Sequence, residues 1–276
     1  MTRTALITGA SRGIGKVIAE RFAKEGIRVL IAAKSVKENP DLPGTIYSVK
    51  EDIRKKYPNS EVYPFQIDIR DDIDVIKLFS TINKLYGGVD ILINNAGALH
   101  WQNITNTSMK KYDLINDINV RGSFVLSREC IKNMVNRGKG GHIIMHSPPL
   151  PNPTDTKIYK GKTGYMISKY GMTMTAMGIS EEYRNDGIAA NTIWPATAIE
   201  TAAVINNNLG TKKMWRKPDI ISDAIWGIIN EPSETFTGNQ LIDEEYLRTK
   251  GVTDFSKYQV VEGCEPPKLL DLFNSV

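Results

Sequence analysis

Tyr165 and Lys169 lie four residues apart at the start of a helical pattern, so their side chains would share one helix face. A phenol can exchange a proton with a reacting oxygen, and a nearby ammonium favours the phenolate, which would move the tyrosine pKa from about 10 toward working pH. A second pair with this spacing, Tyr246 and Lys250, occurs near the carboxyl end of the chain. We interpret the second pair as coincidence, because no clear element surrounds it, whereas Tyr165 follows the fifth predicted strand.

A glycine-rich turn lies far upstream, between an apolar run and a helical pattern over residues 14–25. Gly9, Gly13 and Gly15 would let the backbone approach a pyrophosphate, and the free N–H groups that begin the next helix would bind it. The spacing differs from GxGxxG but serves the same geometry, and a tight turn without a ligand is the alternative. Combined with the tyrosine–lysine pair, this turn predicts hydride transfer from a bound nicotinamide, with the tyrosine handling the proton.

The type of dinucleotide can be predicted from the end of the second predicted strand. An acidic residue there would hold the ribose hydroxyls of NAD, whereas cations there suit the 2′-phosphate of NADP. This chain has Ala33 and Lys34 at that point, and Arg12 lies in the glycine turn. We therefore expect NADP as the cofactor. The alternative is that Lys34 and Arg12 are solvated surface charges.

The elements that must position these residues alternate along the whole chain. Apolar, β-branched runs separated by helical patterns predict a parallel sheet that is covered on both faces. The expected fold is one α/β domain, a doubly wound Rossmann sheet of seven parallel strands, with ligands beyond the carboxyl ends of the strands. The predicted strands are 4–8, 28–33, 61–67, 89–94, 141–147, 188–193 and 238–242, and the helical patterns lie near 14–25, 46–57, 72–86, 107–137, 163–185 and 218–230.

Several stretches do not follow this alternation. Residues 35–43 and the proline-rich residues 148–163 are predicted to be loops. Residues 196–217 mix small, apolar and aromatic side chains and are expected to form a lid over the nicotinamide. The dinucleotide-binding domain would then occupy residues 1–243. Residues 244–276 are expected to be an irregular tail packed on that domain.

Composition and charge exclude several other classes of protein. The net charge of +4 is small for 276 residues and no long basic cluster occurs, so charge favours neither a nucleic-acid nor a membrane partner. Cys130 and Cys264 give neither a disulfide framework nor metal-ligand spacing, and we expect no metal. A strand begins almost at once and no apolar run approaches membrane-spanning length, so a cytoplasmic enzyme acting on a small molecule is expected.

The order of these motifs resembles the short-chain dehydrogenase/reductase family over about residues 4–243. The resemblance is carried by Thr8–Gly15, Asn94–Gly97, Asn119-Val120 and the Tyr165/Lys169 pair. It implies an NADP-dependent oxidoreductase of carbonyl or alcohol groups, built as a homodimer or homotetramer. Further stretches resemble the hydroxysteroid dehydrogenase-like branch of the family, which implies an apolar, steroid-like or fatty-acyl substrate: Ile31–Lys34, Pro43–Tyr47, Ser147–Pro149, Ser168–Met172 and Trp194-Pro195.

The resemblance also assigns roles to individual residues. Asn119 would hold a water molecule that links Lys169 to solvent, and its alternative is an ordinary helix-kink asparagine. Asp68 would contact the adenine ring, with a helix N-cap as its alternative. In this assignment the cofactor is contacted by Thr8, Gly9, Ser11, Arg12, Gly13, Ile14, Gly15, Lys34, Asp68, Ile69, Asn95, Ala96, Gly97, Tyr165, Lys169, Pro195, Thr197 and Ile199.

The fifth predicted strand departs from the family pattern. Pro148 stands where the family's catalytic serine usually falls, and Ser147 lies one residue earlier. A serine hydroxyl would hold the substrate carbonyl oxygen beside the tyrosine. Either the prolines redirect Ser147 or the site is altered, and we expect Ser147 to act. His146 is predicted to be a strand-end residue and not a catalyst.

A second departure follows the sixth predicted strand, where Pro195-Ala196 replaces the family's common Pro-Gly.

The sequence leaves two alternative functions open. One is a nucleotide-binding regulator with little turnover, which only the displaced serine supports. The other is a reductase of enoyl or ketoacyl thioesters, whose sign would be an acyl-chain groove under the lid with cations at its mouth.

Overall fold

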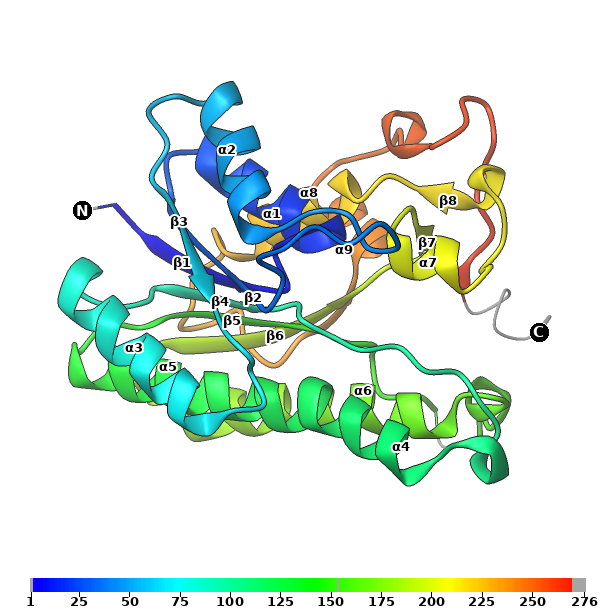
Figure 1. The fold of residues 1–276 in the computed structure, drawn as a ribbon, viewed down its shortest axis with the longest axis horizontal. Helices are drawn as coiled ribbons and strands as arrows, with labels where there is room; N and C mark the ends of the chain where they lie inside the picture. Colours follow the sequence, from blue (N-terminus) through cyan, green and yellow to red (C-terminus); the bar gives the residue numbers. More distant parts are fainter. Residues whose placement is uncertain (1, 153, 270–276) are drawn as a thin grey trace.

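The computed structural model describes residues 2–152 and 154–269. Within these residues a seven-stranded parallel sheet forms the centre of the molecule, in the order β3-β2-β1-β4-β5-β6-β9 (Figure 1). The predicted doubly wound Rossmann sheet is confirmed. Its strands are β1 (Thr4–Thr8), β2 (Arg28–Ala33), β3 (Val62–Gln66), β4 (Ile91–Asn94), β5 (Gly141–His146), β6 (Ile188–Trp194) and β9 (Gln240–Ile242).

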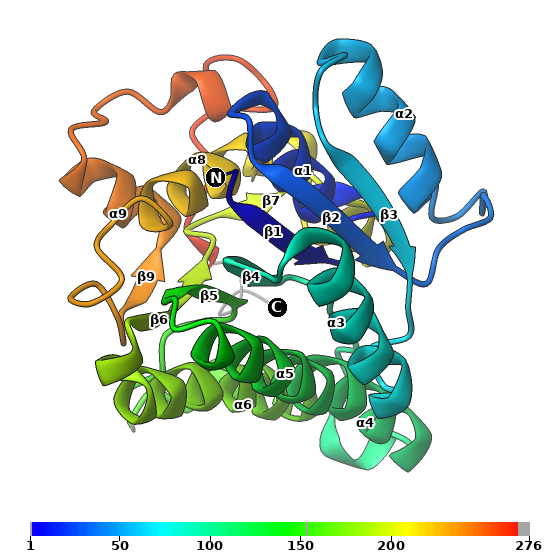
Figure 2. The same cartoon turned by 90° about the vertical axis from the view of Figure 1, so that its left-hand side faces the viewer.

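Two layers of helices cover the sheet, one on each face (Figure 2). The strands are apolar on both sides, and neighbouring residues face different layers. Ile7 packs with the first layer and Leu6 with the second, as Ile31 and Leu30 do on the next strand. The first layer holds α1 (Gly13–Lys24), α2 (Ile46–Lys56), α8 (Asp219–Ile228) and α9 (Asp243–Thr249), and the second holds α3 (Asp72–Tyr86), α5 (Ser123–Asn136) and α6 (Thr163–Glu182).

The long helix predicted over 107–137 is divided into three parts. The chain forms α4 (Met109–Asn116), a π-helical stretch (Asp117–Gly122) and then α5. Short π-helical stretches between α-helical segments occur frequently at functional sites. This π-helical stretch contains Asn119 and Gly122, and both are buried.

The prediction of an irregular tail over residues 244–276 is wrong for its first six residues, which belong to a helix over residues 243–249. These residues form α9, which begins with three acidic side chains in its first turn. Acidic residues at that end are favoured by the helix dipole, and this signal was available in the sequence. The helix was missed because its apolar side is short and consists mainly of Tyr246 and Leu247. Residues 270–276 of the predicted tail lie outside the described residues.

The predicted lid contains more regular structure than its composition suggested. It holds β7 (Ala198–Ile199), α7 (Ala202–Asn206) and β8 (Trp215–Arg216), and β7 pairs with β8 in a small parallel sheet. We use the name C-terminal strap for residues 250–269, which follow α9 and run along this lid (Figure 1). No helix among the described residues is long and apolar enough to cross a membrane.

Candidate active site

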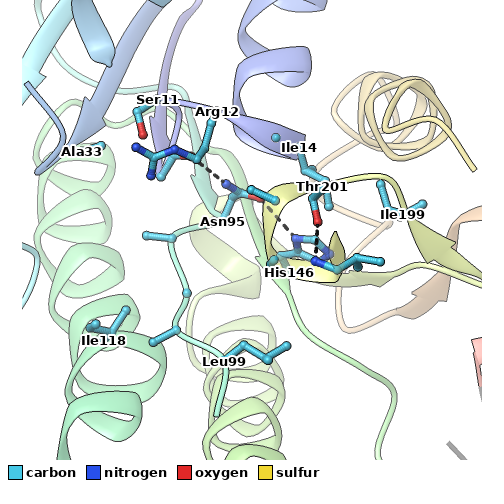
Figure 3. A pocket seen from close by; sticks show the side chains of 18 of the residues that line it. Ser11, Arg12, Ile14, Ala33, Asn95, Leu99, Ile118, His146, Ile199 and Thr201 are labelled. Carbon is cyan, nitrogen blue, oxygen red and sulfur yellow. Dashed lines mark hydrogen bonds between the residues drawn. The ribbon is translucent and has the colours of Figure 1, made fainter. Parts of the chain in front are cut away.

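A cavity of about 460 Å³ opens beyond the carboxyl ends of the strands, between the glycine turn and the lid. Figure 3 shows Ser11 and Arg12 at one side, His146 beside Asn95, and Ile199 and Thr201 of the lid nearby. Most of the residues proposed from the sequence meet here. Those that line the cavity are Gly9, Ser11, Arg12, Gly13, Ile14, Lys34, Asp68, Ile69, Asn95, Ala96, Gly97, Tyr165, Lys169, Pro195 and Ile199.

The glycine turn has the backbone geometry that close approach to a ligand requires. Gly9 and Gly13 have φ values of +66° and +53°, a region that residues with a Cβ rarely adopt. A Cβ on Gly15 would lie 2.6 Å from the Gly9 carbonyl oxygen, so only glycine fits there. Helix α1 has neither an N-cap side-chain bond nor an acidic residue in its first turn. Its first N–H groups and positive dipole end therefore fit a pyrophosphate group.

Thr8 and Gly15 shape this turn from behind the cavity, and they do not line it. The Thr8 hydroxyl donates to the Ile93 carbonyl at 3.2 Å and accepts from the backbone N–H of Asn95 and of Ala96. The Asn95 side-chain amide in turn donates to the Thr8 carbonyl at 3.0 Å. These bonds hold the turn after β1 against the turn after β4.

Two cations, Arg12 and Lys34, lie at the side of the cavity where the sequence predicts the adenosine of the cofactor. The Arg12 guanidinium donates to the Ser35 hydroxyl at 3.1 Å and to the carbonyls of Pro43 and Gly44. Burial lowers the pKa of Arg12 from its usual value, with Glu38 opposing that shift. The contacts hold the guanidinium in one orientation beside Ser35, which also lines the cavity. This arrangement suits a phosphate group at the ribose 2′ position.

Lys34 is more exposed, and it contacts the carboxylate predicted to meet the adenine. The Lys34 ammonium lies 3.1 Å from Asp68, which also accepts hydrogen bonds from Arg70. These hydrogen bonds, with that of Arg70 the largest, hold the pKa of Asp68 well below its usual range. Asp71, and not Asp68, caps helix α3 with its side chain. Asp68 and Ile69 both face the cavity, as an adenine contact requires.

Tyr165 and Lys169 lie one turn apart on α6, and both side chains are buried against the cavity. The Lys169 ammonium donates to the His146 carbonyl at 2.8 Å. Burial lowers the pKa of Lys169 to about 7. Burial also raises the pKa of Tyr165 above its usual range, whereas the spacing predicted a lowering. Burial disfavours the charged phenolate, so the phenol keeps its proton at neutral pH.

Asn119 supports the cavity wall without lining the cavity. Its side chain exchanges two hydrogen bonds with the backbone of Ala98, at 2.8 and 3.0 Å, and donates to the Ser168 hydroxyl at 2.9 Å. A Cβ on Gly97 would lie within 3.5 Å of both the Asn119 oxygen and the Lys169 ammonium. Asn119 therefore fixes the chain after β4 close to Lys169.

Ser147 does not line the cavity, so its action on the substrate stays a prediction that its position does not support. The residue is fully buried between β5 and α6. Its hydroxyl lies 2.9 Å from the Thr173 hydroxyl, which donates to the Pro148 carbonyl at 2.7 Å. His146, the last residue of β5, lines the cavity, whereas Ser147, the next residue, contacts Thr173 of α6.

Several cavity residues were not proposed from the sequence. His146 contacts Asn95 through its ring nitrogen at 3.2 Å and packs edge-on against Trp194. Burial lowers the pKa of His146 to about 3, so its ring is neutral. Its position at the end of β5 was the available signal. The other missed residues are mainly apolar and include Leu99, Trp101, Trp194, Leu209 and Leu269.

Thr197 and the second tyrosine–lysine pair lie apart from the cavity. The Thr197 hydroxyl is buried under the lid with no hydrogen-bond partner among the described residues. The Tyr246 hydroxyl donates to Glu231 at 2.9 Å, and Lys250 pairs with the same carboxylate. This cluster joins α9 to the end of α8 and is a structural contact between helices.

This combination of sheet, glycine turn and tyrosine–lysine pair defines a nicotinamide-dependent oxidoreductase of the Rossmann type. The family model described as short chain dehydrogenase matches residues 3–211. The chain belongs to this family, which binds a nicotinamide cofactor.

Among its relatives, the chain is 43% identical over 272 residues to hydroxysteroid dehydrogenase-like protein 2 of Xenopus tropicalis and 40% identical to that of Homo sapiens. These matches cover 98% and 97% of this chain and 63% of each relative, so the chain spans less than two thirds of their length. The structure is similar to a short chain dehydrogenase of Mycobacterium thermoresistibile, with a TM-score of 0.87 and 40% identity over 96% of this chain and 93% of that one. The structure is also similar to a putative dehydrogenase from Xanthomonas campestris, with a TM-score of 0.89 and 34% identity over 98% of both chains.

Proposed function

We propose that this protein is an NADP-dependent oxidoreductase that reduces a carbonyl group on an apolar substrate, or oxidises the corresponding alcohol. One observation carries the proposal: Tyr165 and Lys169 share a cavity with the glycine turn and with the two cations of the adenosine side, Arg12 and Lys34. The bound nicotinamide would supply or accept the hydride. The protein's residues would bind the dinucleotide and move the proton.

Tyr165 would donate the proton to the carbonyl oxygen during reduction. Its raised pKa suits this direction, because a phenol that stays protonated at neutral pH is ready to donate. In the oxidation direction Tyr165 would accept the proton from the alcohol. Lys169 stands beside the tyrosine, where its charge would stabilise the phenolate that remains after donation. With Ser147 facing Thr173, the oxygen of the substrate would depend on Tyr165 as its donor.

The preference for NADP rests on charge at the end of β2. No acidic side chain stands at Ala33 or Lys34, where it would repel a 2′-phosphate. Arg12 and Ser35 are already joined at this point of the cavity wall. Contacts of a guanidinium with phosphate are charge-assisted and directional, so Arg12 would contribute most of the discrimination.

The substrate would be apolar because the far side of the cavity is lined by Leu99, Trp101, Trp194 and Leu209. We propose a steroid-like or fatty-acyl compound, and the name of the hydroxysteroid dehydrogenase-like relatives agrees with the steroid-like one. We also propose a homodimer or homotetramer. Exposed apolar side chains on α5 and α6, including Phe124, Ile167 and Met174, support self-association. A cytoplasmic location stays a prediction.

The experiment that tests this function compares the wild type with Tyr165→Phe and Ser147→Ala. NADPH and NADH binding is measured by fluorescence, and turnover is measured with a panel of ketones and aldehydes. We expect Tyr165→Phe to lower kcat by about 10²–10⁴-fold with NADPH binding retained, because only the proton donor is removed. Ser147→Ala should change kcat by less than about threefold, since a hydroxyl bonded to Thr173 does not reach the substrate.

The position of Ser147 favours one alternative, an NADP-binding regulator with little turnover. That alternative would be supported by tight NADPH binding without turnover on any carbonyl compound in the panel. A large loss of kcat in Ser147→Ala would show instead that the serine turns toward the cavity when the substrate binds.

A further inference from the structure

The C-terminal strap runs along the lid, and its last residue, Leu269, lines the cavity. The backbone N–H of Lys217, just after β8, donates to the Tyr258 carbonyl at 2.7 Å. Arg216 forms an antiparallel bridge with Gln259. Residue 268 then bridges Thr197, and the N–H of Leu269 donates to the Ala196 carbonyl at 2.7 Å. The strap thus contacts the lid near both of its ends.

A buried cation joins the strap to the lid and to α9. Arg216 of β8 is fully buried, and its guanidinium donates to the Phe255 carbonyl at 3.1 Å and to Glu244 at 3.1 Å. It also pairs with Glu265 of the strap. Breaking one partner of such a cluster leaves an uncompensated buried charge, so the arrangement resists rearrangement. Arg216 therefore fixes the path of the strap four residues before it reaches the cavity.

Leu269 enters the same apolar surroundings as the proton donor. It lines the cavity, and it packs on the cluster of buried residues that contains Tyr165. Leu99, Trp101 and Trp194 pack on this cluster too. The backbone N–H of Leu269 is already bonded to Ala196, so the strap presents hydrocarbon and not a donor to this side of the cavity. The family model ends at residue 211, so this wall lies outside the residues that the model matches.

We propose that the C-terminal strap forms a wall of the substrate pocket and that Leu269 contacts the distal part of a long alkyl chain whose carbonyl group meets Tyr165. The inference deepens the proposed function and rests on it. Its ligand class is a ketone or aldehyde with an aliphatic chain. Arg216 and Glu265 are positioning residues, because they act by holding the strap and do not touch the substrate.

The first test uses the full chain and the methyl ketones butanone, octanone and dodecanone with NADPH. Leu269→Ala should raise KM for dodecanone about tenfold, change KM for butanone by less than about twofold, and leave kcat nearly unchanged, because only contacts with the distal chain are lost. Lys268→Ala is the matched control, since its side chain is exposed on the same strap. An equal change for all three ketones, or no change, would overturn the role of Leu269.

A second readout does not depend on turnover. Trp101 and Trp194 line the cavity, so dodecanone binding can be followed through tryptophan fluorescence. We expect Leu269→Ala to weaken dodecanone binding about tenfold while NADPH affinity is unchanged. Equal dodecanone affinity in the wild type and the variant would overturn the inference. If NADPH fails to bind the wild type, the proposed function fails, and the dodecanone titration still tests the wall on its own.

The positioning role is tested with Glu265→Gln, which removes one carboxylate from the buried guanidinium. We expect faster hydrogen exchange over residues 265–269 and a severalfold higher KM for dodecanone, with kcat nearly unchanged. Glu262→Gln removes an exposed carboxylate of the same strap and serves as the control. Exchange rates and KM values that match in the two variants would show that the pairing does not position the strap.

Discussion

The glycine-turn region and the lid–strap region face each other across one cavity, but they are held in different ways. The turn after β1 is fixed by steric limits on glycines and by hydrogen bonds of Thr8 and Asn95 to nearby backbone. The lid is fixed to the strap and to α9, through the buried guanidinium of Arg216 and through the Asp243 carboxylate of α9. The first region depends on backbone shape, whereas the second depends on buried charge.

This difference separates binding of the cofactor from selection of the substrate. At Gly9 and Gly15 of the glycine turn a Cβ would clash with nearby backbone, so few sequences satisfy this geometry. The lid and strap present side chains such as Leu209 and Leu269, which can change in size without altering the backbone. We infer that cofactor binding is sensitive to changes in the first region and that substrate preference is sensitive to changes in the second.

The largest effect is expected from Gly15→Ala. The added methyl group would lie 2.6 Å from both the Gly9 carbonyl and the Asn95 side-chain amide. We expect more than a tenfold loss of NADPH affinity and a loss of about 1–3 kcal/mol in the free energy of unfolding, because backbone must move. Fluorescence titration and urea denaturation measure the two effects.

Gly26→Ala is the control for that substitution. Gly26 has a φ of +79° but open space around its Cβ position. It should lose about 1–2 kcal/mol of stability through backbone strain alone, with NADPH affinity unchanged. Normal NADPH affinity in Gly15→Ala would contradict the view that backbone shape holds this region.

A smaller and more selective effect is expected from Arg12→Ala. Removal of a charge-assisted contact with the 2′-phosphate should weaken NADPH binding by roughly 10–100-fold, which corresponds to about 1.5–3 kcal/mol. NADH lacks this phosphate, so its affinity should change little. Lys16→Ala removes a nearby cation, on helix α1, that pairs with Asp52 outside the cavity, and it should affect neither dinucleotide. Equal losses for NADPH and NADH would remove the basis for an NADP preference.

The smallest effect, on stability and its pH dependence, is expected from Asp243→Asn. Asp243 accepts hydrogen bonds from the N–H groups of Ala196 and Glu244, which an asparagine oxygen could also accept. Burial raises the pKa of Asp243 to about 7, against partial compensation by these bonds and by Arg216. The folded protein therefore binds the proton more tightly than the unfolded chain, so the Asp243 contribution to stability falls as pH rises from about 4 to about 7.

Thermal unfolding between pH 4 and 8 measures this contribution. The asparagine variant should lack this part of the pH dependence and melt a few degrees higher than the wild type at pH 8. Other titrating groups are common to both proteins, and the difference between the two profiles isolates Asp243. Parallel profiles would show that buried charge does not limit the lid–strap region.

Sequence patterns were sufficient to predict the sheet, the glycine turn and the Tyr165/Lys169 pair. Strand and helix periodicity is local, and the requirement for glycine at positive φ acts on single residues such as Gly9. The direction of the Ser147 side chain could not be obtained in this way. A shift of one residue reverses the face of a strand, and the position of β5 against α6 decided that His146 faces the cavity.

The sequence by itself therefore determined the backbone path of the cofactor side and the residue types available for proton transfer. Only the tertiary structure decided that Leu269 reaches the cavity, that Arg216 is buried, and that the Tyr165 pKa rises. The physical reason is that burial and long-range pairing depend on which distant segments meet, and neither is encoded in the spacing of neighbouring residues.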